Sequence, residues 1–229
     1  MAQTAKTAKT AKTAKKRSPL SRVLGWAALG VVAFGAVKIV HSQQAPSGPP
    51  SPAAAAYLPP IPPAGSIFAD PLAFSAPVHI DIPAVGIHAD LLKVGLGSDG
   101  AIGVPPLDQA QKAAWYEKGP APGQSGPAVI DAHVDSSQTK DYRGAFYNLG
   151  EVLPGEQINV TRADHKVAVF TVDSVQQAPK DQFPTSRVYG SVDYAALRLI
   201  TCGGDFDYAK HSYEDNTIVY AHMSQASGK

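Results

Sequence analysis

The stretch KVAVFTVDSV, residues 166–175, indicates the fold class. Half of its positions carry β-branched residues, and the polar residues Thr171 and Asp173 are interleaved with apolar ones. This pattern is typical of a β-strand that buries one face. Similar short apolar runs occur on both sides of the stretch, so it belongs to a series of strands and not to a helical domain.

The apolar runs of this series are separated by turn sequences such as GSDG, LPGE and ADHK. We predict strands at Val78–Ile82, Ile87–Val94, Ala128–His133, Gln157–Thr161, Val167–Val175, Leu197–Thr201 and Thr217–His222. Only Asp108–Ala114 and Asp193–Leu197 are candidates for helical turns. About seven or eight strands in about 150 residues predict an all-β domain, either a closed barrel or a sandwich.

Charge is unevenly distributed along the 229 residues, although the net charge is only +1. Residues 1–22 contain seven basic residues and no acidic one. From residue 42 onward, 12 basic and 19 acidic residues give a net charge of −7. Because nucleic acids are negatively charged, this net negative charge argues against nucleic-acid binding by the main domain.

The N-terminal part of the chain predicts export. Residues 1–19, with their TAK repeats, predict a disordered basic tail on the cytoplasmic side. Residues 20–40 are apolar between Arg22 and Lys38, whose stems can snorkel, so this segment predicts a single-pass transmembrane signal anchor. A signal peptide cleaved at the small residues of 51–57 is the alternative, and either interpretation places the following domain outside the cell.

A proline-rich segment follows the predicted anchor. Ten of the chain's 20 prolines lie between Pro46 and Pro77. This composition predicts that 41–76 is a stiff extracellular spacer and that 77–229 is the folded domain.

The only cysteine, Cys202, lies in LITCGG, at the end of an apolar run and before two glycines. A single cysteine excludes an intramolecular disulfide, a CxxC pair and a zinc–thiolate cluster. The position predicts a reactive residue displayed where a strand ends. The alternative is a buried structural cysteine in a non-enzymatic exported β-domain.

A thiol attacks only as thiolate, so a catalytic cysteine needs a base or a charge nearby. Of the seven histidines, His133 is the one that ends an apolar run, PAVIDAH, and opens a polar loop. His133 and Cys202 thus occupy equivalent positions and form a candidate catalytic pair. They are 69 residues apart with the histidine first, which disfavours an L,D-transpeptidase and a papain-like peptidase. No HxxxH or carboxylate cluster indicates a metal, and no cofactor is expected.

Several motifs together resemble the sortase family. LRLITCGGDFD with YEDNTIVYAH resembles the cysteine strand and the strand after it, and VIDAHVDS resembles the histidine segment. IPAVGIHADLLKVGLGSDGAIGVP, WYEKGPAPGQSGPAVI and FPTSRVYG resemble the actinobacterial class F branch. The resemblance extends from about Pro77 to Met223.

The resemblance implies a membrane-anchored cysteine transpeptidase built on a closed β-barrel. Such an enzyme cleaves a C-terminal sorting signal of LPxTG type between Thr and Gly. It then joins the new carboxyl to an amine of a cell-wall precursor or a pilus subunit. An enzyme of the same fold that acts mainly as a hydrolase is the alternative.

The resemblance also assigns roles to individual residues. Cys202 matches the nucleophile that forms the thioacyl intermediate, and His133 matches the general acid and base. Thr201 matches the Thr of the TLxTC motif, where strand packing is its simpler role. Asp135 either orients the His133 imidazole or caps a loop.

The third catalytic residue departs from the family pattern. Many sortases have an arginine early in the strand after the cysteine, but no arginine follows Cys202 in this chain. Asn216 occupies about that position and could donate a hydrogen bond to the oxyanion. Arg187 is the preferred charged substitute, and Arg198, about 13 Å before Cys202 along a strand, is less suitable.

Overall fold

The computed structural model describes residues 48–53, 62–98 and 100–228. The predicted cytoplasmic tail, the predicted anchor at 20–40 and parts of the predicted spacer lie outside the described residues. Within the described ranges, no helix is both long and apolar enough to cross a bilayer.

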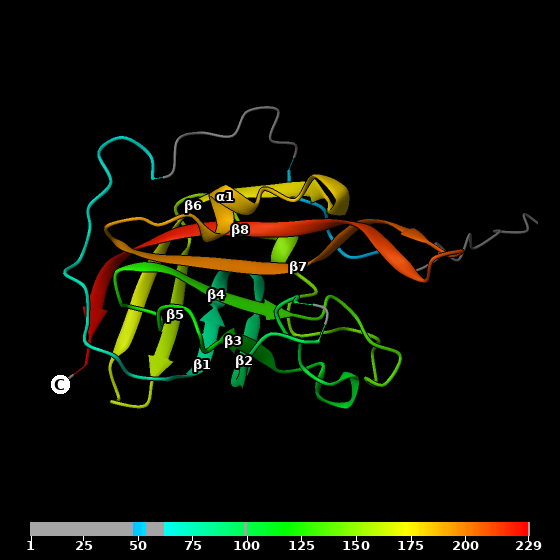
Figure 1. Cartoon of the computed structure of the whole chain (residues 1–229), viewed down its shortest axis with the longest axis horizontal. Helices are drawn as coiled ribbons and strands as arrows, with labels where there is room; N and C mark the ends of the chain where they lie inside the picture. Colours follow the sequence, from blue (N-terminus) through cyan, green and yellow to red (C-terminus); the bar gives the residue numbers. More distant parts are fainter. Residues whose placement is uncertain (1–47, 54–61, 99, 229) are drawn as a thin grey trace, which may run out of the picture. The chain divides into compact units, whose positions relative to one another are not determined.

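Eight strands form a closed barrel in the order β1-β2-β3-β4-β7-β8-β6-β5 (Figure 1). The strands are β1 Pro77–Ile82, β2 Ile87–Val94, β3 Ala113–Tyr116, β4 Gly126–Ala132, β5 Gln157–Arg162, β6 Val167–Pro179, β7 Ala195–Asp207 and β8 Ser212–Ser227. The all-β barrel prediction is therefore confirmed, and the sandwich alternative is wrong.

The barrel is closed by antiparallel pairing of β1 with β5, while β2–β3 and β4–β7 are parallel pairs. Alternate residues point inward, so Ala128, Ile130 and Ala132 of β4 join the apolar interior. A closed sheet leaves no unpaired edge strand, and its interior holds most of the buried apolar side chains.

A second, smaller apolar layer lies on the outer face of β4, β7, β8 and β6. Its buried members are Val129, Ala178, Val188, Ile200, Ile218 and Tyr220. Val188 comes from the short helix α1, Thr185–Tyr189, which packs against this face. These central strands are therefore apolar on both faces, which explains why their sequences read as nearly continuous apolar runs.

Both predicted helical turns need correction. Leu107–Gln109 is a 3-10 turn, but Ala113–Tyr116 is the buried strand β3, so the predicted turn at Asp108–Ala114 is wrong over its second half. Asp193–Leu197 is not helical because β7 begins at Ala195. In both places alanine-rich sequence is extended because its neighbours pair with it, which overrides its weak strand propensity.

Cys202 lies inside a strand and not at its end. β7 continues to Asp207 and pairs with β8 in a long hairpin, with a register shift between Gly203 and Phe206. Gly204 has φ of 75°, and a Cβ on Gly203 would lie 2.5 Å from Thr217 Oγ1. The two glycines thus permit an irregularity in the ladder directly after Cys202 instead of ending the strand.

Residues 66–76 form a strap along the barrel. The Ala69 amide donates to the Met223 carbonyl at 2.9 Å, and the Leu72 amide donates to the Gly123 carbonyl at 2.7 Å. The Phe68 ring packs on Tyr194 and His222 with centroid distances of 5.0 and 5.2 Å. This last part of the predicted spacer is therefore in contact with the folded domain.

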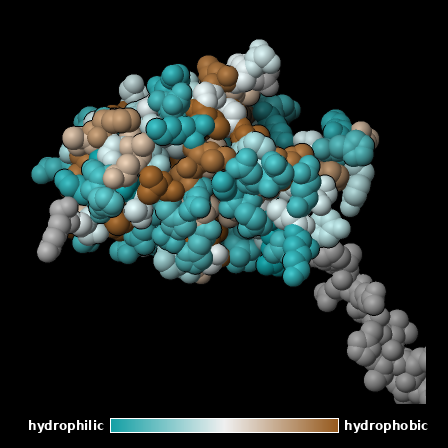
Figure 2. All heavy atoms as spheres, turned by 90° about the horizontal axis from the view of Figure 1, so that it is seen from below, coloured by the Kyte–Doolittle hydropathy of each residue, from teal (hydrophilic) through white to brown (hydrophobic). Residues whose placement is uncertain are grey.

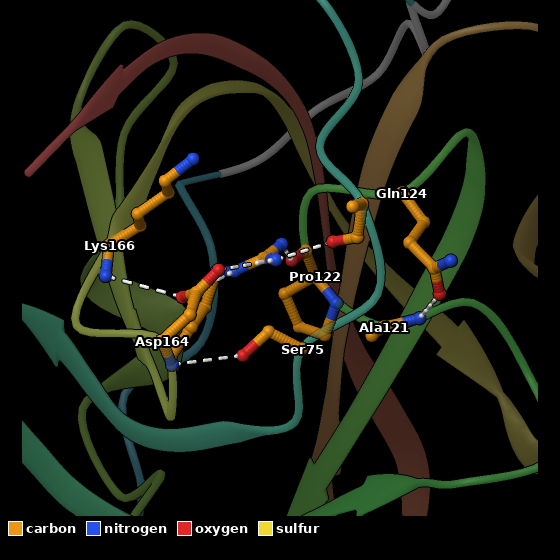
Figure 3. Close-up of polar contacts among 8 residues, drawn as sticks. Ser75, Ala121, Pro122, Gln124, Asp164 and Lys166 are labelled. Atoms are coloured by element: carbon orange, nitrogen blue, oxygen red, sulfur yellow. Dashed lines mark hydrogen bonds and ion pairs between the residues drawn. The ribbon is translucent and has the colours of Figure 1, made fainter. Parts of the chain in front are cut away.

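A buried arginine fastens the strap. The Arg162 side chain is 1% exposed and donates to the carbonyl oxygens of Ala73 and Pro122 at 2.5 and 2.8 Å. Arg162 also pairs with Asp164, whose amide donates to Ser75 Oγ at 3.0 Å (Figure 3). The strap, the β3–β4 loop and the end of β5 therefore meet around one guanidinium.

The face in Figure 2 is mainly hydrophilic, with apolar side chains gathered near its middle. The most exposed large apolar side chains come from the strap and from loops and include Ile67, Phe74, Leu96, Tyr142 and Tyr208.

Candidate active site

Cys202 lies on β7, and His133 is the first residue after the neighbouring strand β4. In the parallel β4–β7 pair, Asp131 is opposite Ile200. His133 and Cys202 each come two residues later, so both side chains are on the outer face. Adjacent strands are about 5 Å apart, which places thiol and imidazole within reach of one substrate bond.

Thr201 joins β4 and β7 just beyond the point where their pairing ends. Its Oγ1 donates a 2.7 Å hydrogen bond to the carbonyl oxygen of Ala132, and Thr201 is 2% exposed. The residue before the cysteine is thus bonded to the residue before the histidine. Thr201 therefore fixes the spacing between His133 and Cys202, the predicted catalytic pair.

A hydrogen bond of the His133 ring fixes which of its two nitrogens carries the proton. Its Nε2 is 2.6 Å from the carbonyl oxygen of Pro105. A carbonyl oxygen only accepts, so Nε2 carries the proton and Nδ1 is the atom left to exchange a proton with substrate. The Phe146 amide also donates to the His133 carbonyl at 3.1 Å, which holds the backbone after β4.

The Cys202 thiol holds its proton more tightly than an exposed thiol. Burial raises the pKa of Cys202, and the charges of Asp131 and Asp135 act in the same direction. Lys180 acts against them through its charge and a hydrogen bond, which lower the pKa of the thiol. Cys202 is therefore a thiol at rest, with one cation beside it that favours the thiolate.

Asp131 is a site residue that the sequence did not single out. It lies on the outer face of β4, two residues before His133. Burial raises the pKa of Asp131 to about 8. A carboxyl that keeps its proton up to this pH can donate a hydrogen bond as well as accept one in the groove beside the thiol.

Lys180 is the second residue that the sequence did not reveal. It follows β6 as the first residue of the 3-10 turn Lys180–Gln182, and its Nζ donates to Ser212 Oγ at 2.8 Å. No motif marks it in the sequence. Its proximity to Cys202 follows from the pairing of β6 with β8 and of β8 with β7.

Two further predicted site residues, Asn216 and Asp135, lie close to His133 and Cys202 in the fold. Asn216 is directly opposite Cys202 in the β7–β8 ladder. Asp135 accepts a hydrogen bond from the Tyr213 hydroxyl, whereas the hydrogen bond of the His133 ring goes to Pro105. Asp135 therefore anchors the β7–β8 hairpin to the loop after His133.

Arg187 lies at the other end of the outer face. Its guanidinium carbon is 4.9 Å from the centre of the Tyr220 ring. Tyr220 pairs with Arg198, four residues before Cys202 on β7, or about 13 Å of strand. Arg187 and Arg198 also line the same small cavity at that end.

An apolar layer and a cavity lie on the two sides of the pair. The outer apolar layer approaches Cys202 through Ile200, with Ile102 and Tyr116 packed at its margin. On the other side, a cavity of about 760 Å³ separates the loop after His133 from the β7–β8 hairpin, with Asp135 and Gly204 in its wall. Within the described ranges, no group of three or more His, Cys, Asp or Glu side chains could hold a metal ion.

A closed β-barrel that brings a cysteine of β7 next to a histidine at the end of β4 is the arrangement of a cysteine acyl-transfer enzyme. The sortase domain model matches residues 80–224, which include both side chains. This chain belongs to the sortase family and is a cysteine transpeptidase.

The comparison with solved structures finds sortases, and the fold is shared with a sortase from Actinomyces oris. The SrtA sortase from Actinomyces oris is 18% identical, with a TM-score of 0.50 over 68% of this chain and 84% of that one. A pilus-related sortase C of Group B Streptococcus is 17% identical, with a TM-score of 0.49 over 66% of this chain and 69% of that one. The comparison with curated proteins gives no match.

Proposed function

We propose that this chain is a class F sortase, anchored in the cell membrane by residues 20–40 with its barrel outside the cell. Its substrates are proteins with a C-terminal LPxTG-like sorting signal, and its acceptor is an amine of a peptidoglycan precursor or a pilin. The observation that carries the proposal is the placement of His133 and Cys202 side by side on one outer face of the barrel.

The chemistry follows from this placement. The thiol proton of Cys202 passes to Nδ1 of His133, the sulfur attacks the scissile carbonyl, a C–S bond forms and the carbonyl oxygen takes up negative charge. His133 protonates the leaving amine as the C–N bond breaks, which gives a thioacyl enzyme. The incoming amine then attacks the thioester, gives its proton to His133 and releases Cys202.

The apolar side chains near His133 and Cys202 suit an extended sorting signal that contains apolar residues. Val104 and Leu107 are each 49% exposed and flank Pro105, whose carbonyl holds the His133 ring. Together with the outer apolar layer, they offer contacts for the Leu and Pro of an LPxTG-like segment. Burial of such side chains contributes about 25 cal/mol per Å².

The predicted anchor and spacer support the location. Seven basic residues before residue 23 favour a cytoplasmic N-terminus, and the spacer holds the barrel away from the bilayer. An enzyme in that place meets both secreted proteins and cell-wall precursors.

The test is mass spectrometry of the full-length enzyme with a panel of LPxTG-like peptides and a small amine. We expect cleavage after Thr and a product that carries the amine, both absent with Cys202→Ala. A product with a free carboxyl and no amine would support the hydrolase alternative. Cleavage that persists in Cys202→Ala would contradict the proposal.

A further inference from the structure

Lys180 reaches Cys202 across three strands. Ala178 of β6 pairs with Asn216 of β8, and Asn216 pairs with Cys202 of β7. These three residues therefore form one row on the outer face. Lys180 comes two residues after Ala178, so its side chain starts on the same outer face one step beyond this row, and its ammonium group hydrogen-bonds to the Cys202 thiol.

The ammonium group is held in place. Its Nζ donates to Ser212 Oγ at 2.8 Å, while the Ser212 hydroxyl donates to the Tyr213 carbonyl at 3.2 Å. Ser212 thus acts as an acceptor for the lysine and a donor to its own strand. A long side chain that is otherwise exposed gains a fixed position beside the nucleophile.

Lys180 is also the cation that acts on the thiol. The groups that influence the pKa of Cys202 are its burial, Lys180, Asp131 and Asp135, and only Lys180 lowers it. The residue opposite Cys202 is the neutral Asn216. Without Lys180, the described charges around the sulfur would all oppose the thiolate.

We propose that Lys180 supplies the positive charge at the reacting atoms, first to the Cys202 thiolate and then to the oxyanion of the tetrahedral intermediate. As the C–S bond forms, the electron pair of the carbonyl π bond moves to oxygen, so the negative charge moves by one bond length or two. The ammonium can follow this charge because it has three donors on a flexible stem. When the C–N bond breaks, the electron pair on oxygen re-forms the carbonyl π bond, and the leaving nitrogen takes the C–N electron pair and a proton from His133.

The thiolate part of this proposal is independent of the substrate, whereas the oxyanion part rests on the proposed function. Because Cys202 is the only cysteine, alkylation of the full-length chain by iodoacetamide reports on this thiol alone. The pH dependence of the alkylation rate gives the pKa of the thiol without any sorting peptide.

The decisive variant is Lys180→Met, which keeps the apolar stem and removes the charge. We expect the alkylation midpoint to rise by about one pH unit, because a cation within about 4–6 Å lowers a thiol pKa by that order. Lys180→Arg should keep most of the effect, and Ser212→Ala should give a smaller rise. The matched control is Lys210→Met, which removes an exposed lysine paired with Asp207 on the same hairpin.

Two results would overturn the thiolate role. One is an unchanged midpoint in Lys180→Met, and the other is an equal rise in Lys210→Met, which would indicate a general charge effect. A circular-dichroism spectrum equal to that of the wild type excludes misfolding as the cause.

The oxyanion role has a separate readout. With a peptide that the wild type cleaves, Lys180→Met should lower kcat about 10²–10³-fold with little change in KM. Cleavage at the wild-type rate by Lys180→Met would contradict this role. If the wild type cleaves no LPxTG-like peptide, the proposed substrate class is wrong, while the alkylation profile still decides whether Lys180 serves the thiolate.

Discussion

The hydroxyl of Thr201 donates a 2.7 Å hydrogen bond to the carbonyl oxygen of Ala132 and so couples the strand of the nucleophile to the strand of the histidine. The bond lies at the end of the parallel β4–β7 pairing, where backbone hydrogen bonds no longer fix the spacing. It explains why a threonine, and not an apolar β-branched residue, precedes Cys202.

Thr201→Val should therefore reduce both stability and turnover. Valine keeps the shape but leaves the buried Ala132 carbonyl without this donor, which costs about 1–3 kcal/mol in the free energy of unfolding. We expect kcat to fall about tenfold or more because His133 is then less well placed. Urea unfolding and peptide cleavage measure the two effects. Thr201→Ser is the control, and a Ser variant as impaired as Val would argue against the hydrogen bond.

Removal of either member of the catalytic pair should abolish transfer. Cys202→Ala should eliminate cleavage and thioacyl formation, and His133→Ala should reduce both to near background. Mass spectrometry of the enzyme after exposure to peptide detects the thioacyl adduct. Retained far-ultraviolet circular dichroism shows that the fold is intact. Detection of a thioacyl adduct in Cys202→Ala would contradict the assignment of Cys202 as the nucleophile.

Asp131→Asn should stabilise the protein at neutral and alkaline pH. The pKa of Asp131 is raised to about 8 in the folded state, so the folded state retains a proton that the unfolded chain loses above about pH 4. The stability of the wild type therefore falls as pH rises from about 4 to about 8 and is level above that range. The asparagine variant lacks this loss and should gain on the order of 1–3 kcal/mol at pH 8.

The control for this experiment is Asp193→Asn, an exposed carboxyl next to Tyr194. Unfolding by urea at pH 5 and at pH 8 measures the difference. A gain of equal size at both pH values would show that Asp131 is ionised in the folded protein. Asp131→Asn should also lower the midpoint for Cys202 alkylation, because the Asp131 charge raises the pKa of the thiol.

The strap should contribute to stability. A chain that starts at residue 77 contains every strand, and we expect it to fold, as the change in composition before Pro77 predicts. This shorter chain lacks the Ala73 carbonyl oxygen, which accepts a hydrogen bond from the buried Arg162 side chain. It also lacks the two backbone hydrogen bonds that the amides of Ala69 and Leu72 donate. We therefore expect 77–229 to be roughly 2–4 kcal/mol less stable than 62–229.

A matched pair of point variants tests the same contact. Phe68→Ala removes a ring packed on Tyr194 and His222, whereas Ile67→Ala changes a side chain that is 77% exposed. Only the first should lower the midpoint of thermal unfolding. Equal unfolding midpoints for the two fragments would show that the strap adds nothing to the barrel.

Much of the fold was predictable because alternation and turn sequences are local signals. All seven predicted strands are present, and the eighth, β3, was missed because AAWY is short and rich in alanine. Its extended form comes from pairing with β2 and β4, which no local pattern encodes. The two glycines after Cys202 suggested the end of a strand, whereas a hairpin that spans the irregularity extends the strand through them.

For the site, the sequence predicted the residues that motifs mark but not those that only packing brings near. His133, Thr201 and Cys202 belong to recognisable stretches, and their strands are neighbours in the barrel. Lys180 is 22 residues from Cys202 and reaches it only through the β6–β8–β7 register. Asp131 resembles an ordinary polar residue in a strand until its burial beside the thiol is known.

The role of Arg187 can be decided by a direct comparison with Lys180 and Asn216. The sequence predicts that Arg187 stabilises the oxyanion, because no arginine follows Cys202. The placement of its guanidinium over Tyr220, about 13 Å of strand from the cysteine row, favours a role at the distal end of the groove instead. We therefore expect Arg187→Ala to alter KM more than kcat, with kcat lowered less than tenfold.

Asn216→Ala should lower kcat by an intermediate factor, because an amide opposite Cys202 can donate one neutral hydrogen bond to the oxyanion. The measurement is steady-state cleavage of one peptide by the three alanine variants, with KM and kcat separated. A loss of about 10²–10³ in kcat for Arg187→Ala, with KM unchanged and Lys180→Ala nearly silent, would return the oxyanion role to Arg187. Such a result would require the helix α1 and its loop to move toward Cys202 when substrate binds, since the guanidinium is otherwise held over the Tyr220 ring.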